Sequence, residues 1–261
     1  QKGIDYVIQG RQIIPIDEFT GRLLKEHRFS LFIHQLLELK ENLKVGGHEH
    51  LMTLPLPTFF DCYGKKAGMT GTIDFPVARD ELSRIYGISD VVVIPTRHPS
   101  QRKDHAPRVF VDRQKLDSSL FEMARELSVQ GTPVLVITPS VLESKILGRL
   151  FKKGGVPYQV LNAENEYQEN QIISRAGCPG VITISTNMSG RGTDIKIDKR
   201  LSKTAGLAVL ATFKSDISPR LDYQWMGRAA RQGHPGSTQC FLYWNPADYG
   251  LEAENLRMFQ E

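Results

Sequence analysis

The sequence predicts an α/β fold in which helices cover a parallel sheet on both faces. From about residue 88 onward, short apolar runs rich in β-branched residues alternate with stretches of helical character. Continuous apolar strands of this kind are typical of parallel sheets that are buried on both faces. Glycines also stand where the helices of this pattern would end, at Gly131, Gly154-Gly155 and Gly177.

The part of the chain before this region predicts a small β-hairpin and a helix. Residues 4–8 and 12–16 are short β-rich runs on either side of Gln9-Gly10, which is the pattern of a hairpin. A helical pattern follows from Leu31 to Lys44 and is ended by Gly46-Gly47.

The remaining elements follow from the same reasoning. Residues 55–67 predict a short helix that leads into the loop Gly68-Met69-Thr70-Gly71-Thr72. Strands are expected at Val91–Pro95, Arg108–Val111, Val134–Thr138, Tyr158–Leu161, Val181–Ser185, Leu207–Ala211 and Gln239–Tyr243. Helices are expected between them at 114–129, 141–153, 165–176 and 219–232.

Composition narrows the class of protein. The 261 residues carry a net charge of +4, which permits contact with nucleic acid or anionic lipid without arguing for either. The three cysteines are scattered and odd in number, which fits a reducing compartment better than a disulfide framework. No apolar run reaches the roughly 18 residues of a membrane span. The first residues already have the pattern of a strand, so we expect no signal peptide, and the missing initiator Met suggests a fragment of a longer protein.

The first candidate site is the loop after the expected strand at 181–185. Gly190 and Gly192 flank Arg191, and Asp194 follows. Ligands of open α/β sheets bind beyond the carboxyl ends of the strands, and glycines there let backbone N–H groups approach a phosphate. Arg191 would add forked donors, and Asp194 would accept from ribose hydroxyls or orient an arginine. A tight turn with a surface Arg–Asp pair has the same pattern.

The second candidate site is the segment Gln224–Gly233. Arg228 and Arg231 are three residues apart, so they would share one face of the expected helix. Two guanidinium groups on one face suit a triphosphate, and an arginine placed at the developing charge accelerates phosphoryl transfer. For this spacing alone, a solvated basic face would be the better interpretation. Together, the two segments look like the nucleotide-sensing motifs on the second RecA-like lobe of helicase-type ATPases.

Two other segments are weaker candidates. The phosphate-loop pattern Gly-x-x-x-x-Gly-Lys-Ser/Thr occurs nowhere in the sequence. Asp17-Glu18 has the form of a magnesium-binding pair after a strand, but without a phosphate loop an exposed turn fits it better. His48-Glu49-His50 lacks the four-residue spacing of a zinc helix, so we expect no metal site in this chain.

Beyond these motifs, nearly the whole chain resembles the preprotein translocase motor SecA. The most specific stretches are Ala67–Thr72, which reads A-G-M-T-G-T, and the two candidate sites. Further similar stretches, in chain order, are Asp5–Ile8, Ile16–Arg22, the helix residues His34, Gln35, Glu38, Lys40 and Glu41, and then Leu51–Tyr63, Val92–Thr96, Arg102–Asp104 and Val160–Ala163.

The resemblance implies a function for the chain. In that family, ATP lies between two RecA-like lobes, and the first lobe carries the phosphate loop and the magnesium carboxylates. This chain would be the second lobe, with ATP as cofactor and magnesium held by the missing first lobe. By position, Arg228 and Arg231 would be catalytic, and the nucleotide-binding residues would be Gly190, Arg191, Gly192, Asp194 and Gln232. The residues that couple the lobes would be Gly68, Met69, Thr70, Gly71 and Thr72.

The resemblance also implies domains and partners. Residues 1–22 would be a hairpin returning from an absent crosslinking domain, 23–47 a helix of the first lobe, 48–250 the second lobe, and 251–261 a terminal helix. The implied partners are the first motor lobe, in the same longer chain or in another chain, an unfolded preprotein and a membrane translocation channel. Nucleic acid is not expected. The implied location is cytoplasmic, peripheral at the inner face of the membrane.

The sequence departs from the family at several positions. The stretch Thr212–Arg220 differs, Met226 replaces an arginine, Glu164 replaces a lysine, and the insertion after Ile195 shrinks to Lys196–Thr204. Two further hypotheses therefore stay open. One is a SecA-like binding or regulatory module without turnover, and the other is the C-terminal lobe of an RNA or DNA helicase.

Overall fold

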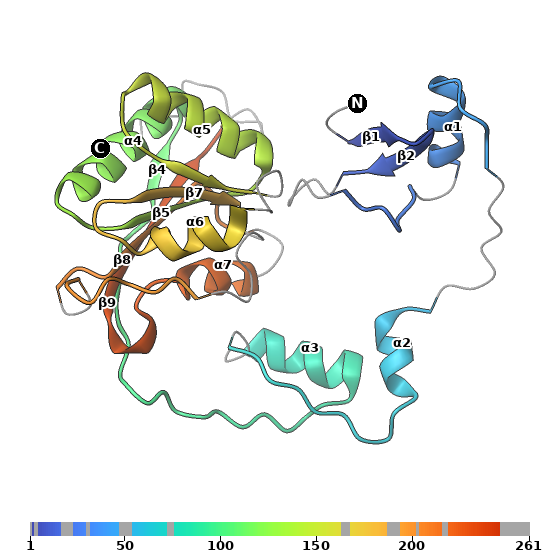
Figure 1. Ribbon diagram of the computed structural model, residues 1–261. Helices are drawn as coiled ribbons and strands as arrows, with labels where there is room; N and C mark the ends of the chain where they lie inside the picture. Colours follow the sequence, from blue (N-terminus) through green and yellow to red (C-terminus); the bar gives the residue numbers. More distant parts are fainter. Residues whose placement is uncertain are drawn as a thin grey trace. The chain divides into compact units, whose positions relative to one another are not determined.

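The computed structural model describes residues 2, 5–16, 23–29, 32–46, 54–71, 76–162, 168–186, 194–201, 204–215 and 219–245. The chain divides into two units. Figure 1 labels their helices and strands. One unit holds Gln1–Val7, Ile14–His27 and His98–Glu261, and the other holds Ile8–Ile13 and Arg28–Arg97. Several residues discussed above lie outside the described residues: Asp17, Glu18, His48, Glu49, His50, Thr72, Glu164, Gly190, Arg191, Gly192 and the terminal segment 251–261.

Among the described residues, seven strands form one parallel sheet. They are β3 (Gln101–Asp104), β4 (Arg108–Phe110), β5 (Val134–Thr138), β6 (Gln159–Leu161), β7 (Ile182–Thr186), β8 (Leu207–Ala211) and β9 (Pro235–Tyr243). The strand order is β3-β9-β8-β5-β7-β6, and β4 also pairs with β9. Every one of these pairs is parallel, as the alternation of apolar strands and helices predicts.

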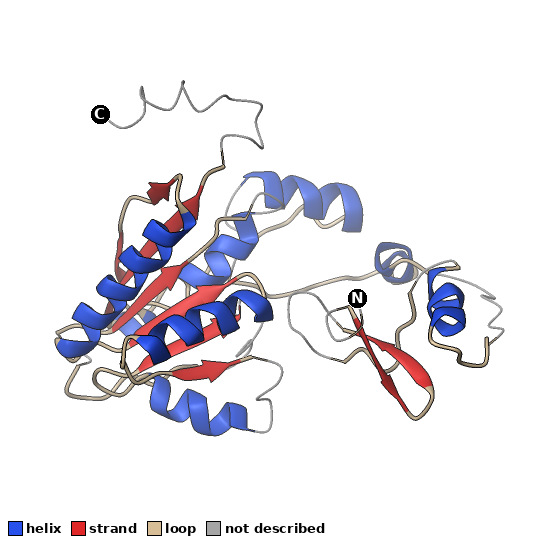
Figure 2. Ribbon diagram, turned by 90° about the horizontal axis from the view of Figure 1, so that it is seen from above, coloured by secondary structure: helices blue, strands red, loops and turns tan. Residues whose placement is uncertain are grey.

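Helices pack on both faces of the sheet (Figure 2). On one face, α4 (Arg113–Val129) and α5 (Val141–Lys153) share a buried cluster with Val134 and Val136 of β5. On the other face, Leu135 and Ile137 of the same strand share a cluster with Trp225 of α7 (Pro219–Met226). The side chains of β5 thus alternate between the two clusters, as a fully buried strand requires. The predicted fold class is confirmed.

Several elements differ from the expectations, and the helix Pro76–Tyr86 was not expected at all. Val91–Pro95 is not a strand, and Val92 and Ile94 are 85% and 81% exposed. β-branched residues favour a strand only where a neighbouring strand and a packing surface are present. Conversely, β3 is polar and was not expected, yet it forms through its pairing with β9. The helix expected at 219–232 ends at Met226.

The hairpin before the helix is confirmed. Strands β1 (Tyr6–Gln9) and β2 (Gln12–Pro15) form a two-stranded sheet. Gly10 and Arg11, which connect them, have φ values of +57° and +66°. Two successive positive φ angles are the signature of the type I′ turn that tight hairpins favour.

The described helices of the smaller unit are α1 (Ile33–Lys40), α2 (Leu56–Asp61) and α3 (Pro76–Tyr86). Helix α1 buries polar residues, His34 and Glu38, while its leucines Leu36 and Leu39 are exposed. Glu38 accepts from Arg28 Nη2 at 2.7 Å and from the backbone N–H of Gly46 at 3.1 Å. It therefore ties together the segments before and after the helix. No helix in the described part of the chain is long and apolar enough to cross a membrane.

Candidate functional site

The arginine segment is a tight loop between α7 and β9. Gly227 continues the last helical turn, since its N–H donates to Tyr223 O at 2.9 Å, and Arg228 and Arg231 follow after the helix has ended. Ala230 and Gln232 take positive φ angles of +55° and +58°. The spacing suggested that the two arginines are neighbours on one face of a helix, but they are not. The turn of the backbone between them brings both to one site.

Glycines allow the close packing of this loop. At Gly236, the second residue of β9, an added Cβ would lie 2.6 Å from the backbone nitrogen of Ala230. At Gly227 it would lie 2.8 Å from Tyr223 O, and at Gly233 2.8 Å from the Cβ of His98. Larger residues at these positions would displace the loop, so the glycines keep Arg228 and Arg231 close to the sheet.

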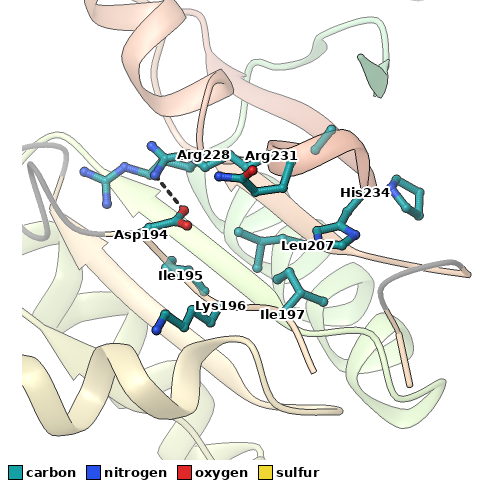
Figure 3. A pocket seen from close by; sticks show the side chains of 11 residues that line it. Asp194, Ile195, Lys196, Ile197, Leu207, Arg228, Arg231 and His234 are labelled. Carbon is teal, nitrogen blue, oxygen red and sulfur yellow. Dashed lines mark hydrogen bonds and ion pairs between the residues drawn. The ribbon is translucent and has the colours of Figure 1, made fainter. Parts of the chain in front are cut away.

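Arg231 and Asp194 form an ion pair (Figure 3). The Nη1 atom of Arg231 lies 2.9 Å from Oδ1 of Asp194. The Nε–H of the same arginine donates to the backbone carbonyl of Gly227, also at 2.9 Å. The two candidate segments, which lie 37 positions apart at these residues, thus meet directly.

The residues after Asp194 are fixed on the sheet. Ile195 and Ile197 pack against the cluster beneath α7, and Ile195 also contacts the cluster beneath α6 (Glu169–Ala176). The N–H of Asp198 donates to the carbonyl of Gly177 at 3.0 Å. A Cβ at Gly177 would lie 2.1 Å from the carbonyl oxygen of Lys196, so the close approach of the two segments requires glycine there.

The two segments enclose a cavity of about 220 Å³. It is lined by Asp194, Ile195, Lys196, Ile197, Leu207, Arg228, Ala230, Arg231, Gln232, His234 and Pro235. Leu207 and Pro235 are the first residues of β8 and β9, so this cavity lies at their amino ends. The arginines come to this end because α7 leads the chain back from the carboxyl end of β8 before they are reached. The loop for which a place beyond the carboxyl end of a strand was expected, residues 187–193, lies outside the described residues.

The electrostatics of the cavity favour an anion. Burial, and then the neighbouring Arg231, lower the pKa of Arg228 to about 10, against an opposing attraction from Glu169. A buried guanidinium beside a second one is stabilised by a polyanion that both can reach. Lys196, which also lines the cavity, adds a cationic group, and His234 adds an imidazole ring. Phosphate oxygens suit this donor set, because arginine binds them with a planar fork.

The site residues expected from the sequence are thus partly brought together. Asp194, Arg228, Arg231 and Gln232 line one cavity, whereas Gly190, Arg191 and Gly192 lie outside the described residues. Gly68 to Gly71 are exposed in the smaller unit, with Met69 fully so. The sequence did not point to Lys196 or His234, because neither belongs to a motif of its own and only the fold places them at the cavity.

A parallel sheet covered on both faces by helices is the arrangement of RecA-like domains. The chain also matches the family model of the SecA P-loop domain over residues 99–203. It matches the model of the SecA preprotein cross-linking domain over residues 1–38. Among curated relatives, the protein translocase subunit SecA of Syntrophus aciditrophicus is 40% identical over 260 residues, and that of Nitratiruptor is 41% identical over 260 residues. The chain belongs to the SecA family.

These relatives are much longer than this chain. The alignments cover 99% of the chain but only 30% of the Syntrophus protein and 29% of the Nitratiruptor protein. Among solved structures, yeast Dbp5 bound to RNA and ADP BeF3 has a TM-score of 0.47 at 15% identity, covering 70% of this chain and 46% of that one. The Escherichia coli DEAD-box protein SrmB, bound to RraA, has a TM-score of 0.43 at 19% identity, covering 61% of this chain and 88% of that one.

Proposed function

We propose that this chain is the second nucleotide-binding lobe of a SecA-like, ATP-driven protein translocation motor. Arg228 and Arg231 would contact the phosphates of an ATP molecule held by a first lobe, with Asp194, Gln232 and the loop residues 190–192 completing the contact. The observation that carries this proposal is the convergence of Arg228, Arg231 and Asp194 on one cavity. The family relationship supports ATP as the ligand.

The chemistry assigned to this lobe is electrostatic. ATP and its magnesium ion would be held by the first lobe, because the phosphate-loop pattern does not occur in this sequence. Closure of the two lobes would bring the guanidinium groups to the phosphates, where they stabilise the charge that develops in phosphoryl transfer. The loop from Gly68 to Thr72 is the proposed coupling element. The remaining partners in this proposal are an unfolded preprotein and a membrane channel, at the cytoplasmic face of the membrane.

Reconstitution tests the proposal. We expect negligible ATP hydrolysis by this chain alone and measurable hydrolysis when it is mixed with the first lobe of a SecA protein. Arg228→Ala should reduce that hydrolysis by about 10³-fold, the scale reported for arginines at this position of a phosphoryl-transfer site. Arg200→Ala is the matched control, because Arg200 pairs with Asp198 outside the cavity. Strong turnover by the chain alone, or turnover that does not depend on Arg228, would contradict the proposal.

One observation favours the second candidate, a binding or regulatory module without turnover. Met226, which replaces an arginine of the family, packs against the buried cluster beneath α7. The replacement is therefore accommodated as an apolar contact. Met226→Arg distinguishes the two functions. If the wild-type chain mixed with a first lobe does not hydrolyse ATP and the Met226→Arg variant does, the result supports a binding or regulatory module without turnover. A third outcome, a salt-sensitive shift of single-stranded RNA without binding of unfolded polypeptide, would favour a helicase lobe.

A further inference from the structure

We infer that Gln101 is a positioning residue that holds the arginine loop, residues 227–234, in the shape in which it meets a polyphosphate. The inference rests on the proposed function and deepens it, because it adds a residue from outside the two candidate segments. Gln101 is the first residue of β3, and its Nε2 atom donates to the backbone carbonyl of Gly233 at 2.9 Å. Gly233 lies between Gln232 and His234, which both line the cavity.

A second contact from the same segment supports this role. The side chain of His98 packs against Gly233, since a Cβ added there would lie 2.8 Å from the Cβ of His98 and 3.1 Å from its Cγ. Gly233 has a φ of +76°, which glycine adopts without strain. The loop can therefore turn at Gly233 directly against His98, while the carbonyl of Gly233 reaches Gln101.

The contacts of the arginine loop come from three parts of the chain. At its start, the N–H of Gly227 continues the hydrogen bonding of α7. In its middle, Arg231 pairs with Asp194 at 2.9 Å. At its end, Gly233 accepts from Gln101. Because these contacts restrain different parts of the loop, loss of the last one should loosen the end of the loop without unfolding α7.

The strand that carries Gln101 has no apolar side chain to bury. β3 reads Gln-Arg-Lys-Asp, and three of its four residues are exposed. Its place is set by its parallel pairing with β9, and at its far end Thr238 Oγ1 donates to Asp104 Oδ1 at 2.6 Å. Hydrogen bonds, and not hydrophobic burial, therefore fix the position of Gln101 beside the loop.

The effect of Gln101 on a ligand is indirect. Gln101 is not among the residues that line the cavity, so it acts through the arginines of the loop. Its hydrogen bond is exposed, and water replaces an exposed partner at little cost in the free energy of unfolding. Binding is more sensitive, because a guanidinium binds phosphate oxygens best when its N–H groups are already directed at them. Loss of Gln101 should thus weaken binding while it leaves stability nearly unchanged.

Two measurements on the 261-residue chain test the inference. Hydrogen exchange of the ligand-free chain reports on the loop directly, because the N–H of His234 donates to Arg231 O at 3.0 Å and exchanges when the loop opens. Titration calorimetry with inorganic tripolyphosphate measures the dissociation constant of the cavity. Gln101→Met removes the donor but keeps the length of the side chain, and Gln101→Lys restores a donor. Gln114→Met is the matched control, because Gln114 is an exposed glutamine on α4.

We expect Gln101→Met to speed the exchange of the His234 amide and to weaken tripolyphosphate binding by about threefold, because the arginines are less ordered before the ligand arrives. Gln114→Met should show neither effect, and Gln101→Lys should restore slow exchange. In the Arg231→Ala background, Gln101→Met should weaken binding by a smaller factor than it does alone. Urea unfolding should give all the glutamine variants a free energy of unfolding close to that of the wild type.

Three results would overturn the inference. In the first, Gln101→Met leaves the exchange of the His234 amide unchanged, so Gln101 does not hold the loop. In the second, the exchange is faster but the free energy of unfolding falls in proportion, so the opening is global. In the third, the exchange is faster but the dissociation constant stays that of the wild type, although Arg228→Ala weakens binding, so the arginines need no positioning.

Failure of the proposed function gives a different result. If Arg228→Ala and Arg231→Ala both leave the dissociation constant unchanged, the cavity is not a phosphate site and the proposed function fails. The exchange measurement needs no ligand, so in that case it still decides whether Gln101 holds the loop.

Discussion

Gly206 lies directly against the backbone carbonyl of Pro235, where β8 and β9 begin side by side. A Cβ at position 206 would lie 1.7 Å from that carbonyl oxygen, and Gly206 has a φ of +63°. Leu207, which follows Gly206, lines the cavity that contains Arg228 and Arg231, and so does Pro235. This contact therefore sets the spacing of the two strand ends that hold the cavity open.

Gly206→Ala should destabilise the larger unit by about 3 kcal/mol, because it adds a clash with backbone to the strain of a left-handed conformation. The measurement is urea unfolding followed by the fluorescence of Trp225, which lies in the adjacent cluster. Gly155→Ala is a matched control with a φ of +69° but open space around the added Cβ, so it isolates the conformational strain. The control substitution should lower the free energy of unfolding by about 1 kcal/mol. Equal losses would show that the contact with Pro235 is unimportant.

Asp222→Ala should destabilise the fold by about 2 kcal/mol or more, because two donors would lose their buried acceptor. Oδ1 of Asp222 accepts from the backbone N–H of Ser215 at 2.9 Å and from the indole N–H of Trp225 at 3.1 Å. Asp222→Asn keeps an acceptor oxygen at the same place, and we expect it to retain part of the stability. Thermal unfolding of the three proteins compares them. An alanine variant as stable as the asparagine variant would mean that these hydrogen bonds contribute nothing.

Arg228→Met should stabilise the fold at neutral pH by about 1 kcal/mol while it removes polyphosphate binding. The pKa of Arg228 is lowered to about 10, mainly by burial, so the charged form is less favourable in the folded chain than in the unfolded one. For a cation with a lowered pKa, stability increases as pH rises from about 10 toward the higher pKa of an ordinary arginine. At pH 7 the penalty is present in full, and the apolar methionine relieves it. Urea unfolding at pH 7 measures this gain, and a loss of stability would show that the contacts of Arg228 outweigh its burial.

Asp117→Asn should stabilise the fold slightly at pH 7, by about 0.5 kcal/mol after allowance for solvent screening, and have no effect at pH 3. Burial, and then the nearby Glu143, raise the pKa of Asp117 although Arg113 opposes them. A carboxyl group with a raised pKa adds stability below its ordinary pKa, and this stability is lost as pH rises through the raised value.

The measurement for Asp117 is the urea midpoint at both pH values. Glu122→Gln is the control, since Glu122 is an exposed partner of Arg125 on the same helix, α4. This control should show no gain at pH 7. A gain of equal size in both variants would mean that general surface charge, and not the burial of Asp117, is responsible.

Most of the sheet could be predicted from the sequence because the amino-acid composition of its central strands is typical of buried strands. β5, β7 and β8 are buried along their whole length, and each consists of apolar or β-branched residues except for Ser185 in β7. Val91–Pro95 has a similar composition but is not a strand. Composition alone does not make a strand, because a strand also needs a hydrogen-bonded neighbour. The polar strand β3 shows the converse, because only its pairing with β9 identifies it.

For the cavity, the sequence pointed to several of the lining residues but not to their geometry. Motif spacing pointed to Asp194, Arg228 and Arg231, and the three do line one cavity. Their arrangement comes from positive φ angles at Ala230 and Gln232, which helical spacing cannot anticipate. Likewise, the place of the cavity at the amino ends of β8 and β9 follows from the path of α7, a long-range property of the fold.

Ile195 joins the hydrophobic clusters under α6 and α7, and it is the direct chain neighbour of Asp194. A small rotation of either helix would therefore be transmitted through one isoleucine to the carboxylate beside Arg231. Substitutions that alter only the shape of this side chain, such as Ile195→Val, should thus change the orientation of the Arg231 side chain without changing any charged group.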